Sequence, residues 1–342
     1  MPPDSTAAAQ DSAAPRARSG ERAGEAIPKS AFRHEMLLYE HGDEGFLDGT
    51  LGLVRNALAR EAGVLVAVGA GRTAALVEAL DADAQRVRFV RMRSLGRNPA
   101  RIIPVWREFV REHALGGEGD ALGIGEPVWP GRGAAELDEC ERHEALLNLA
   151  FNDGPGWHLL CPYDLDGLDD AVIDAARRTH PLLAWGEQHH VNERYACAHT
   201  PARPFDGELP APRAPVSEFA FSLESLAHVR RAVSVWATEQ ALADERTEEL
   251  VLAVGELAAN SIRHGGGAGT LRYWREDALL MCEVRDAGWL HAPLVGRVRP
   301  PADARSGRGI WLANQLCDLV QIRSSHAGSV VRVHKCVNPE AA

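Results

Sequence analysis

Short apolar segments alternate with amphipathic ones along the first half of the chain, and this alternation constrains the fold more than any other feature. The expected strands are 36–39, 64–68, 87–90, 122–128 and 157–164, and the expected helices are 44–61, 73–80, 99–113, 134–151 and 168–180. Strands that are apolar throughout are typical of parallel sheets buried on both faces. We therefore predict an α/β domain over residues 32–185.

The pattern changes after a proline-rich stretch. Five prolines lie between residues 198 and 216 without a period of 2 or 3.6, so we predict a linker over 186–216. Residues 1–31 have almost no large apolar side chain and are predicted to be a disordered tail. After the linker we expect an α+β two-layer domain over 217–336. Its expected strands are 217–222, 271–274, 278–284, 319–323 and 329–334, and its expected helices are 223–242, 244–263 and 310–318.

Charge and cysteine spacing exclude several classes of protein. The 342 residues carry a net charge of -11 without a basic face, so we expect no direct binding of nucleic acid. The longest apolar stretch, 63–71, is too short to span a membrane, and the first residues lack the apolar core of a secretory signal. We therefore expect a cytoplasmic protein without membrane attachment. The six cysteines form no Cys-x-x-Cys pair, which argues against a zinc finger.

Three separated segments of the second domain carry polar residues in a pattern that suits one ligand. Glu256 and Asn260 are four residues apart on a predicted helix and therefore share a face. Asp286 and Gly288 follow an apolar strand. The segment 306–309, with the sequence SGRG, stands directly before a predicted helix.

Each segment has a physical role if the ligand is ATP. Gly307 and Gly309 allow the backbone to approach phosphate oxygens, and the start of the following helix favours an anion. Asn260 offers Mg²⁺ a neutral oxygen ligand, and Asp286 can accept a hydrogen bond from the adenine amine. Glu256 is placed one turn before Asn260, where it can take the proton of an attacking hydroxyl.

In order and spacing, the segments ELAANSIRHG, VRDAGW and SGRGIWLANQLCDLVQIRS with GSVVRV resemble the GHKL (Bergerat-fold) ATPases, specifically the anti-sigma-factor serine/threonine kinases. The resemblance implies a regulator that binds ATP, Mg²⁺ and a sigma factor, and that phosphorylates a serine or threonine of an anti-anti-sigma antagonist of the STAS type. It makes Glu256 the general base and Asn260 the Mg²⁺ ligand. The implied nucleotide contacts are Asn260, Asp286, Gly288, Gly307, Arg308, Gly309 and Ser329.

Two alternatives remain open within this fold. Many relatives have a second glycine two residues after the first in the aspartate segment, whereas here Gly288 is followed by Trp289 and Leu290. The lid over 289–305 also holds three prolines and no lysine, so a non-catalytic ATP-binding anti-sigma module is one alternative. A sensor histidine kinase is the other. Its nearest candidate phosphoacceptor, His228, has valine and arginine neighbours rather than an acidic residue that would orient the imidazole.

The first domain resembles the MEDS sensory domains through HEMLLY, LGRNPARIIPVWREFV, GEPVWPGR, ELDECERHEALLNLAF and WHLLCPYD. This resemblance implies a RecA-like parallel sheet and a small-molecule signal. A working P-loop would read Gly-x4-Gly-Lys-Ser/Thr, but the corresponding turn, VAVGAGRTAAL, has neither that spacing nor the lysine. We therefore expect a domain that has lost hydrolysis. The sequence does not fix the oligomeric state and is compatible with a homodimer.

Two groups of residues have side chains that can bind a metal ion. Cys140, His143 and Glu144 lie on one predicted helix, where Cys140 and His143 have the spacing to face one ion. We expect instead a buried thiol beside a surface histidine. The adjacent pair His189 and His190 is expected to lie in a solvated loop.

Overall fold

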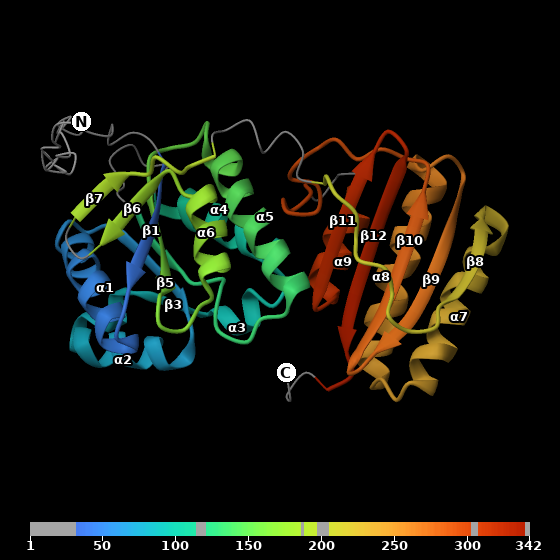
Figure 1. Cartoon of the computed structure of the whole chain (residues 1–342), viewed down its shortest axis with the longest axis horizontal. Helices are drawn as coiled ribbons and strands as arrows, with labels where there is room; N and C mark the ends of the chain where they lie inside the picture. The colour runs from blue at the N-terminus through green and yellow to red at the C-terminus, as the bar shows by residue number, and fades with distance from the viewer. Residues whose placement is uncertain (1–31, 114–120, 186–187, 197–204, 302–306, 339–342) are drawn as a thin grey trace, which may run out of the picture.

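The computed structural model describes residues 32–113, 121–185, 188–196, 205–301 and 307–338. Two sheets, each packed against helices, lie next to each other (Figure 1). We call the described residues from 32 to 196 the N-terminal unit and those from 205 to 338 the C-terminal unit. None of the described helices combines the length and the apolar character needed to cross a lipid bilayer. The predicted tail, 1–31, lies outside the described residues.

The N-terminal unit is built on a sheet with the strand order β3-β2-β4-β5-β1-β6-β7. Neighbouring strands are parallel except β6 and β7, which are antiparallel. The strands are β1 (Arg33–Tyr39), β2 (Gly63–Val68), β3 (Arg88–Arg91), β4 (Ala121–Gly125), β5 (His158–Asp164), β6 (Leu182–Trp185) and β7 (Gln188–Val191). The α-helices are α1 (Gly42–Ala59), α2 (Ala70–Leu80), α3 (Met92–Leu95), α4 (Ile102–His113), α5 (Ala134–Phe151) and α6 (Asp170–Thr179).

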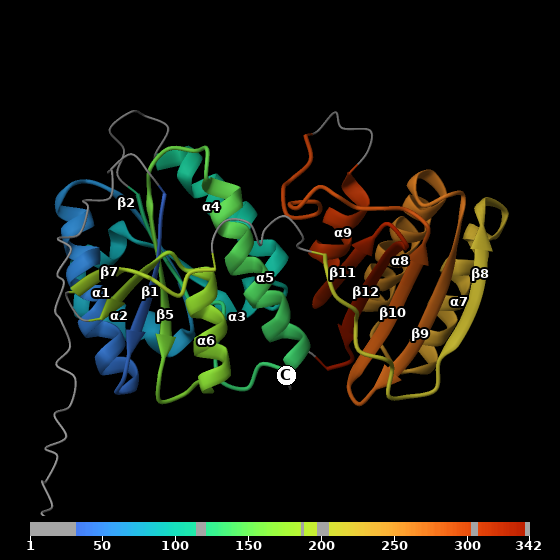
Figure 2. The same cartoon turned by 45° about the horizontal axis from the view of Figure 1, so that its top comes forward.

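Helices cover both faces of this sheet (Figure 2). In β1, Met36 packs in the core formed with α4, α5 and α6, whereas its neighbour Leu37 packs in the core formed with α1 and α2. Successive side chains of a strand point to opposite faces, so a central strand between two helix layers is apolar along most of its length. This explains why the first-half strands read as unbroken apolar runs.

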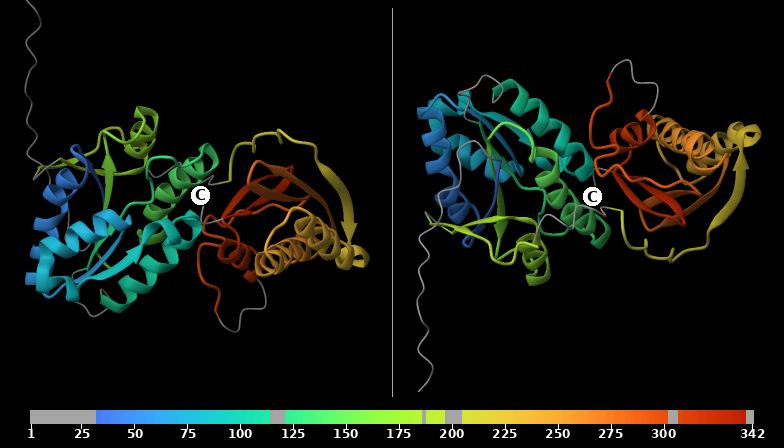
Figure 3. Two further views of the ribbon diagram at one scale, coloured as in Figure 1. Left: turned by 90° about the horizontal axis from the view of Figure 1, so that it is seen from below. Right: turned by 90° about the horizontal axis from the view of Figure 1, so that it is seen from above.

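The C-terminal unit has an antiparallel sheet in the order β11-β12-β10-β9-β8. Its strands are β8 (Ser217–Ser222), β9 (Ala268–Glu276), β10 (Leu279–Asp286), β11 (Leu319–Ser325) and β12 (Gly328–Cys336), and its α-helices are α7 (Leu226–Glu239), α8 (Asp244–His264) and α9 (Arg308–Leu316). The helices lie together on one face of the sheet (Figure 3). Their apolar side chains share a core with alternate residues of the strands.

The opposite face of this sheet carries charged side chains, among them Glu283 and Arg332. The coil that follows residue 205 crosses this face (Figure 1). The coil is tied to the strands at two points: the N–H of Ser324 donates to the carbonyl oxygen of Phe205 (3.0 Å), and the N–H of Arg213 donates to Glu276 Oε1 (2.9 Å). On the same face, burial alone would raise the pKa of Glu283, but Arg332 and neighbouring arginines hold that pKa below its usual value. The coil therefore belongs to the folded unit.

One contact between the two units lies at the C-terminal end of α9. The amide of Asn98 donates to Asn314 Oδ1 (3.0 Å). The guanidinium of Arg101 donates to the main-chain oxygens of Asn314 (2.7 Å) and Cys317 (2.6 Å). A cation is favourable there because the last carbonyl groups of a helix lack partners within the helix.

The second contact joins α5 to the C-terminal unit. Glu139 is buried and accepts hydrogen bonds from Arg297 (3.2 Å) and Arg323 (3.0 Å). Arg323 also pairs with Asp138. Two arginines from separate segments of the C-terminal unit thus share a carboxylate of the N-terminal unit.

The predicted fold class is confirmed: a mainly parallel sheet is followed by an antiparallel α+β layer pair. The range predicted as linker is wrong at its start, because β7 lies inside 186–216 and pairs with β6. All four residues of β7 are exposed, so this short edge strand leaves no apolar signal in the sequence. Helix α5 has the bounds that the sequence predicted.

Candidate functional site

Helix α8 carries the first two predicted site residues. Its apolar residues, among them Leu250, Val254 and Leu257, are buried against the sheet at helical spacing. Glu256 and Asn260 are half-buried, and neither side chain has a hydrogen-bond partner among the described residues. Both therefore remain available to a ligand.

The start of α9 lies against Asn260. A Cβ atom added to Gly309 would stand 2.4 Å from Asn260 Nδ2, so only glycine permits this approach of backbone to side chain. Gly307 is the N-cap residue of α9 and has a left-handed backbone with φ of 85°, while Arg308 is exposed. The remaining residue of the segment, Ser306, lies outside the described residues.

Asp286 ends β10 and meets the end of α8. Its Oδ2 accepts a hydrogen bond from the Ser261 hydroxyl (2.6 Å), and its Oδ1 accepts one from the N–H of Gly288 (2.8 Å). A Cβ added to Gly265 would stand 2.4 Å from the Asp286 side chain. A carboxylate has about four acceptor positions, so Asp286 is held in place and can still accept from a ligand amine.

A chain of hydroxyl groups holds the loop after Asp286. The N–H of Leu290 donates to Ser324 Oγ (2.8 Å), the two hydroxyls of Ser324 and Ser329 are 2.7 Å apart, and Ser329 donates to the carbonyl oxygen of Gly288 (2.8 Å). Ser329 is buried, and its proton is committed to Gly288. Its hydroxyl proton is therefore not available to a nucleotide. Ser329 would act on the nucleotide indirectly, by fixing the position of the Gly288 loop.

Sequence reasoning did not single out Ser261 or Ser324. Ser261 directly follows Asn260 in the quoted segment, and its contact with Asp286 spans 25 positions of sequence. Ser324 lies on β11, opposite Ser329 in the strand register. Both act on the loop through pairings that become visible only once strand register is known.

The loop that follows Gly288 contacts both units. Asn314 Nδ2 donates to the carbonyl oxygen of Gly296 (3.0 Å), and Gly296 itself has a φ of 72° and packs on Ile310. One residue later, Arg297 reaches Glu139 of α5 (3.2 Å). Loop, α9 and α5 are therefore in direct contact.

The turn after β2, which would hold phosphate in a P-loop protein, is filled by an ion-pair cluster. The Arg72 guanidinium pairs with Glu126 and lies 3.0 Å from Asp164. These carboxylates follow β4 and end β5, so the carboxyl end of the sheet is acidic. Carboxylates at this turn disfavour a triphosphate, and the loss of hydrolysis stays a prediction from the sequence.

On α5, Cys140 is a buried thiol, as the sequence predicted. It donates to the carbonyl oxygen of Pro127 (3.4 Å). His143 is not a surface residue but 1% exposed, and burial lowers its pKa to about 3. His189 and His190 were predicted to lie in a solvated loop, but both belong to strand β7. Both side chains are exposed, as expected. His189 Nδ1 also lies 2.7 Å from Glu35 Oε1.

His228 lies exposed on α7, where its ring is 5.0 Å from that of Phe219 on β8. Helix α7 packs along α8 inside the C-terminal unit. It is therefore part of the sheet-and-helix layers rather than a separate helix that could present a phosphoacceptor.

Two family models match the chain. Residues 33–181 match MEDS, the methanogen/methylotroph DcmR sensory domain, and residues 219–335 match the histidine kinase-like ATPase domain. The chain thus combines these two domains, as both resemblances implied. A search of curated proteins finds no match to the sequence.

Two solved structures align with part of the chain. The RsbU and RsbW domains of Rv1364c from Mycobacterium tuberculosis share 15% identity over 36% of this chain and 32% of that chain, with a TM-score of 0.29. The Acinetobacter baumannii histidine kinase AdeS shares 12% identity over 36% of this chain and 68% of that chain, with a TM-score of 0.22. The chain thus covers about a third of the first protein's length. At these TM-scores the alignments carry no argument beyond that of the family models.

Proposed function

We propose that this chain, a MEDS domain joined to a histidine kinase-like ATPase domain, is a signal-responsive partner-switching regulator. The ATPase domain would bind ATP and a sigma factor and phosphorylate a serine or threonine of an anti-anti-sigma antagonist of the STAS type. The observation that carries the proposal is the meeting of three distant segments: Gly309 abuts Asn260, while Asp286 is held by Ser261. The side chains of Asn260 and Asp286 thus lie next to the start of α9 and the end of α8.

The residues present suit a magnesium nucleotide. Asn260 supplies an oxygen without a competing partner, and Mg²⁺ bound beside it would neutralise phosphate charge. Gly307 and Gly309 would let the backbone N–H groups at the start of α9 face phosphate oxygens. Asp286 and Gly288 would take the adenine amine and ring.

In the proposed reaction the antagonist's hydroxyl oxygen attacks the γ-phosphorus. The bond from that phosphorus to the β–γ bridging oxygen breaks, ADP leaves, and the hydroxyl proton passes to Glu256. Glu256 is half-buried and free of other partners. A positioned general base contributes about 10²–10⁴-fold to rate.

The MEDS domain would supply the signal. A cavity of about 270 Å³ opens between α5 and α6, and its wall includes Val128, Tyr163 and Thr179. A small organic molecule fits this volume. The wall also includes Asp138, which pairs with Arg323 of the ATPase domain, so a ligand in the cavity would act next to the contact between the domains.

A phosphate-transfer assay tests the enzymatic part of this proposal. The full chain is incubated with ATP labelled at the γ-phosphate and with a candidate antagonist, and label on the antagonist is counted. Glu256→Gln should retain ATP binding and lower transfer by about 10²–10⁴-fold. Glu248→Gln, an exposed position two turns earlier on α8, is the matched control and should transfer normally.

The outcomes separate the alternatives. Nucleotide binding by the wild type without label on any antagonist would indicate the non-catalytic module. Acid-labile label on this chain itself, lost in His228→Gln, would indicate a histidine kinase. Unchanged transfer by Glu256→Gln would overturn the role assigned to that residue.

A further inference from the structure

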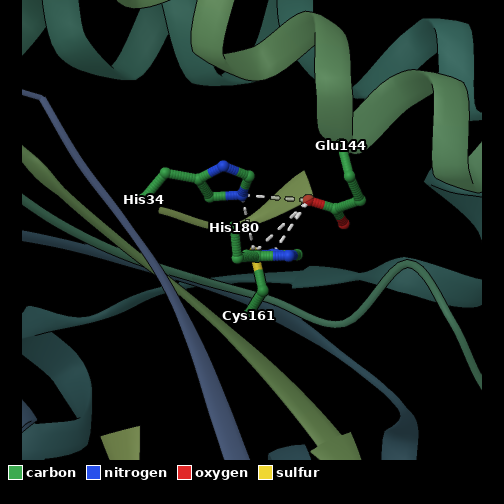
Figure 4. A group of neighbouring side chains, drawn as sticks. All are labelled: His34, Glu144, Cys161 and His180. Carbon is green, nitrogen blue, oxygen red and sulfur yellow. Dashed lines mark hydrogen bonds and ion pairs between the residues drawn. The ribbon is translucent and has the colours of Figure 1, made fainter. Parts of the chain in front are cut away.

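Four buried side chains of the MEDS domain meet beneath α5 (Figure 4). His34 comes from β1, Glu144 from α5, Cys161 from β5, and His180 directly follows α6. Their ligand-type atoms all lie within 4.8 Å of one another, and no member is more than 1% exposed. Of the four, only Glu144 was a predicted candidate ligand, because the four are spread from position 34 to position 180.

The contacts converge on the Glu144 carboxylate. Its Oε2 lies 3.0 Å from His34 Nε2, 3.3 Å from His180 Nε2 and 3.8 Å from Cys161 Sγ. Cys161 Sγ lies 3.5 Å from His34 Nε2. The other carboxylate oxygen of Glu144 and the Nε2 atom of His180 are buried without a hydrogen-bond partner among the described residues.

The surroundings fix which ring nitrogen of each histidine carries the proton. His180 Nδ1 lies 2.8 Å from the carbonyl oxygen of Ala176, which can only accept, so Nδ1 is the protonated nitrogen. His34 Nδ1 lies 3.0 Å from Asn148 Oδ1. The amide of Asn148 donates to the carbonyl oxygen of Thr179 (2.7 Å), which orients its oxygen towards His34.

With Nδ1 protonated, the neutral ring of each histidine directs a lone pair from Nε2 at the carboxylate. Three acceptors, the nitrogens of His34 and His180 and an oxygen of Glu144, then face one another in a dry space. The thiol of Cys161 has a single proton and cannot satisfy all of them. Buried acceptors that face each other without a donor are costly, and a cation between them removes the cost.

We propose that this cluster is a transition-metal site, with Zn²⁺ as the ion that it suits best. Two imidazoles, a thiolate and a carboxylate are a ligand set that zinc accepts, whereas Mg²⁺ and Ca²⁺ require oxygen ligands. With bonds of about 2.0–2.3 Å, ligand atoms at the corners of a tetrahedron stand roughly 3.3–3.8 Å apart. The four measured separations run from 3.0 to 3.8 Å.

The outer contacts have the form that metal-binding histidines use. Ligating histidines donate their second N–H to a carbonyl or carboxylate group, which fixes ring orientation. Here the acceptors are the Ala176 carbonyl for His180 and the Asn148 side chain for His34. Glu144 also lines the cavity between α5 and α6, so this cavity borders the cluster. Binding displaces the thiol proton of Cys161 to solvent and leaves a thiolate ligand.

Metal analysis of the full-length protein tests the proposal. The chain is stripped with a chelator, loaded with Zn²⁺ alone, passed through a desalting column and analysed for metal content. We expect one Zn²⁺ per chain, and in a parallel sample with Co²⁺ we expect the visible bands of tetrahedral cobalt with a thiolate-to-cobalt band in the near ultraviolet. No retained Zn²⁺ or Co²⁺ in the wild type would overturn the proposal, since the cluster would then be held by protons.

Substitutions locate the site. Cys161→Ser should abolish the thiolate-to-cobalt band. The control is Cys140→Ser, which removes another buried thiol, one turn before Glu144 on α5, and should keep both the band and the stoichiometry. Asn148→Ala keeps every proposed ligand and should weaken Zn²⁺ binding about 10- to 100-fold. A thiolate band that survives Cys161→Ser would place the metal elsewhere and overturn the assignment, even if another variant fails to fold.

Discussion

At the residue scale, Gly309 shows how closely the candidate nucleotide site is built. Its missing side chain lets the first turn of α9 touch the amide of Asn260, and a Cβ there would be 2.4 Å from Nδ2. We predict that Gly309→Ala displaces Asn260 and weakens binding of ATP with Mg²⁺ about tenfold or more, because a misplaced ligand loses its contact with the metal. Equilibrium binding of a fluorescent ATP analogue measures this.

The control for that substitution is Gly52→Ala. Gly52 lies within α1, and an added Cβ would meet nothing within 4 Å. Alanine is favoured over glycine inside a helix by about 1 kcal/mol, so this variant should bind ATP normally. If both variants bind ATP equally well, the contact between Gly309 and Asn260 has no part in nucleotide binding.

His334 gives the ATPase sheet a pH dependence. Burial, helped by Arg332, lowers its pKa to about 3 from an ordinary 6.5. Between these values the unfolded chain binds a proton that the folded chain does not, so this contribution to stability is complete above pH 6.5 and is lost as the pH falls towards 3. The loss is up to about 1.4 kcal/mol per pH unit.

We therefore predict that His334→Gln reduces the fall in stability between pH 6.5 and pH 5. Urea midpoints of the wild type and the variant across that range measure the difference. Other titrating groups contribute equally to both proteins and cancel in the comparison. Parallel curves for the two proteins would mean that His334 is protonated as readily in the folded chain as in the unfolded one.

At the element scale, α5 carries one of the two contacts described between the domains. One end of its buried face presents Glu139 to Arg297 and Arg323, and a turn later Glu144 enters the buried cluster. Arg297 belongs to the loop that follows Gly288. Asn314 donates a hydrogen bond to the main chain of the same loop, at Gly296. Glu139 and Arg297 therefore connect α5 to the loop that follows Gly288.

We predict that Glu139→Gln destabilises the chain by about 3–5 kcal/mol, because it leaves the buried guanidinium group of Arg297 without a compensating charge. The apparent melting temperature should fall, and the affinity for ATP should change with it. Glu141→Gln, on the same helix, removes only an exposed pair with Arg178 and should cost about 1 kcal/mol or less. Equal melting temperatures for the two variants would contradict the role given to the domain contact.

The elements also show what the sequence could and could not foretell. Helix α5 and strand β8 have the bounds expected from their patterns, because each is long or periodic enough to be seen. Strand β6 was not expected, although it is apolar. Strand β7 was assigned to the linker, because an edge strand of four exposed residues has no apolar period. The coil after residue 205 was expected to be a linker as well, but hydrogen bonds tie it to the sheet.

The candidate site divides in the same way. Glu256 and Asn260 share a helix, so spacing alone could place them together. The contacts of Asp286 with Ser261 and of Ser329 with Ser324 depend on how helix end and strands are aligned, which no local pattern records. The four-residue cluster in the MEDS domain was missed for the same reason.

At the scale of the whole molecule, the two domains form one connected body through α9 and α5. The turn that contains Asn98 and Arg101 forms hydrogen bonds with the C-terminal end of α9. Gly307 and Gly309 lie at the N-terminal end of the same helix. The MEDS domain thus touches the helix whose other end would face phosphate in the proposed function. In that proposal, these contacts would carry a signal from the MEDS domain to the nucleotide site.

The central claim is that the C-terminal domain binds ATP with Mg²⁺ between Asn260, Asp286 and Gly309. Calorimetric titration of the full chain with ATP in Mg²⁺ tests it most directly, with Asp286→Asn as the site variant and Asp277→Asn, in the exposed β9–β10 turn, as the control. We predict one saturable site per chain in the wild type and the control, and affinity about 10- to 100-fold lower in Asp286→Asn. Absence of saturable heat in the wild type, or equal affinity in all three proteins, would contradict the claim.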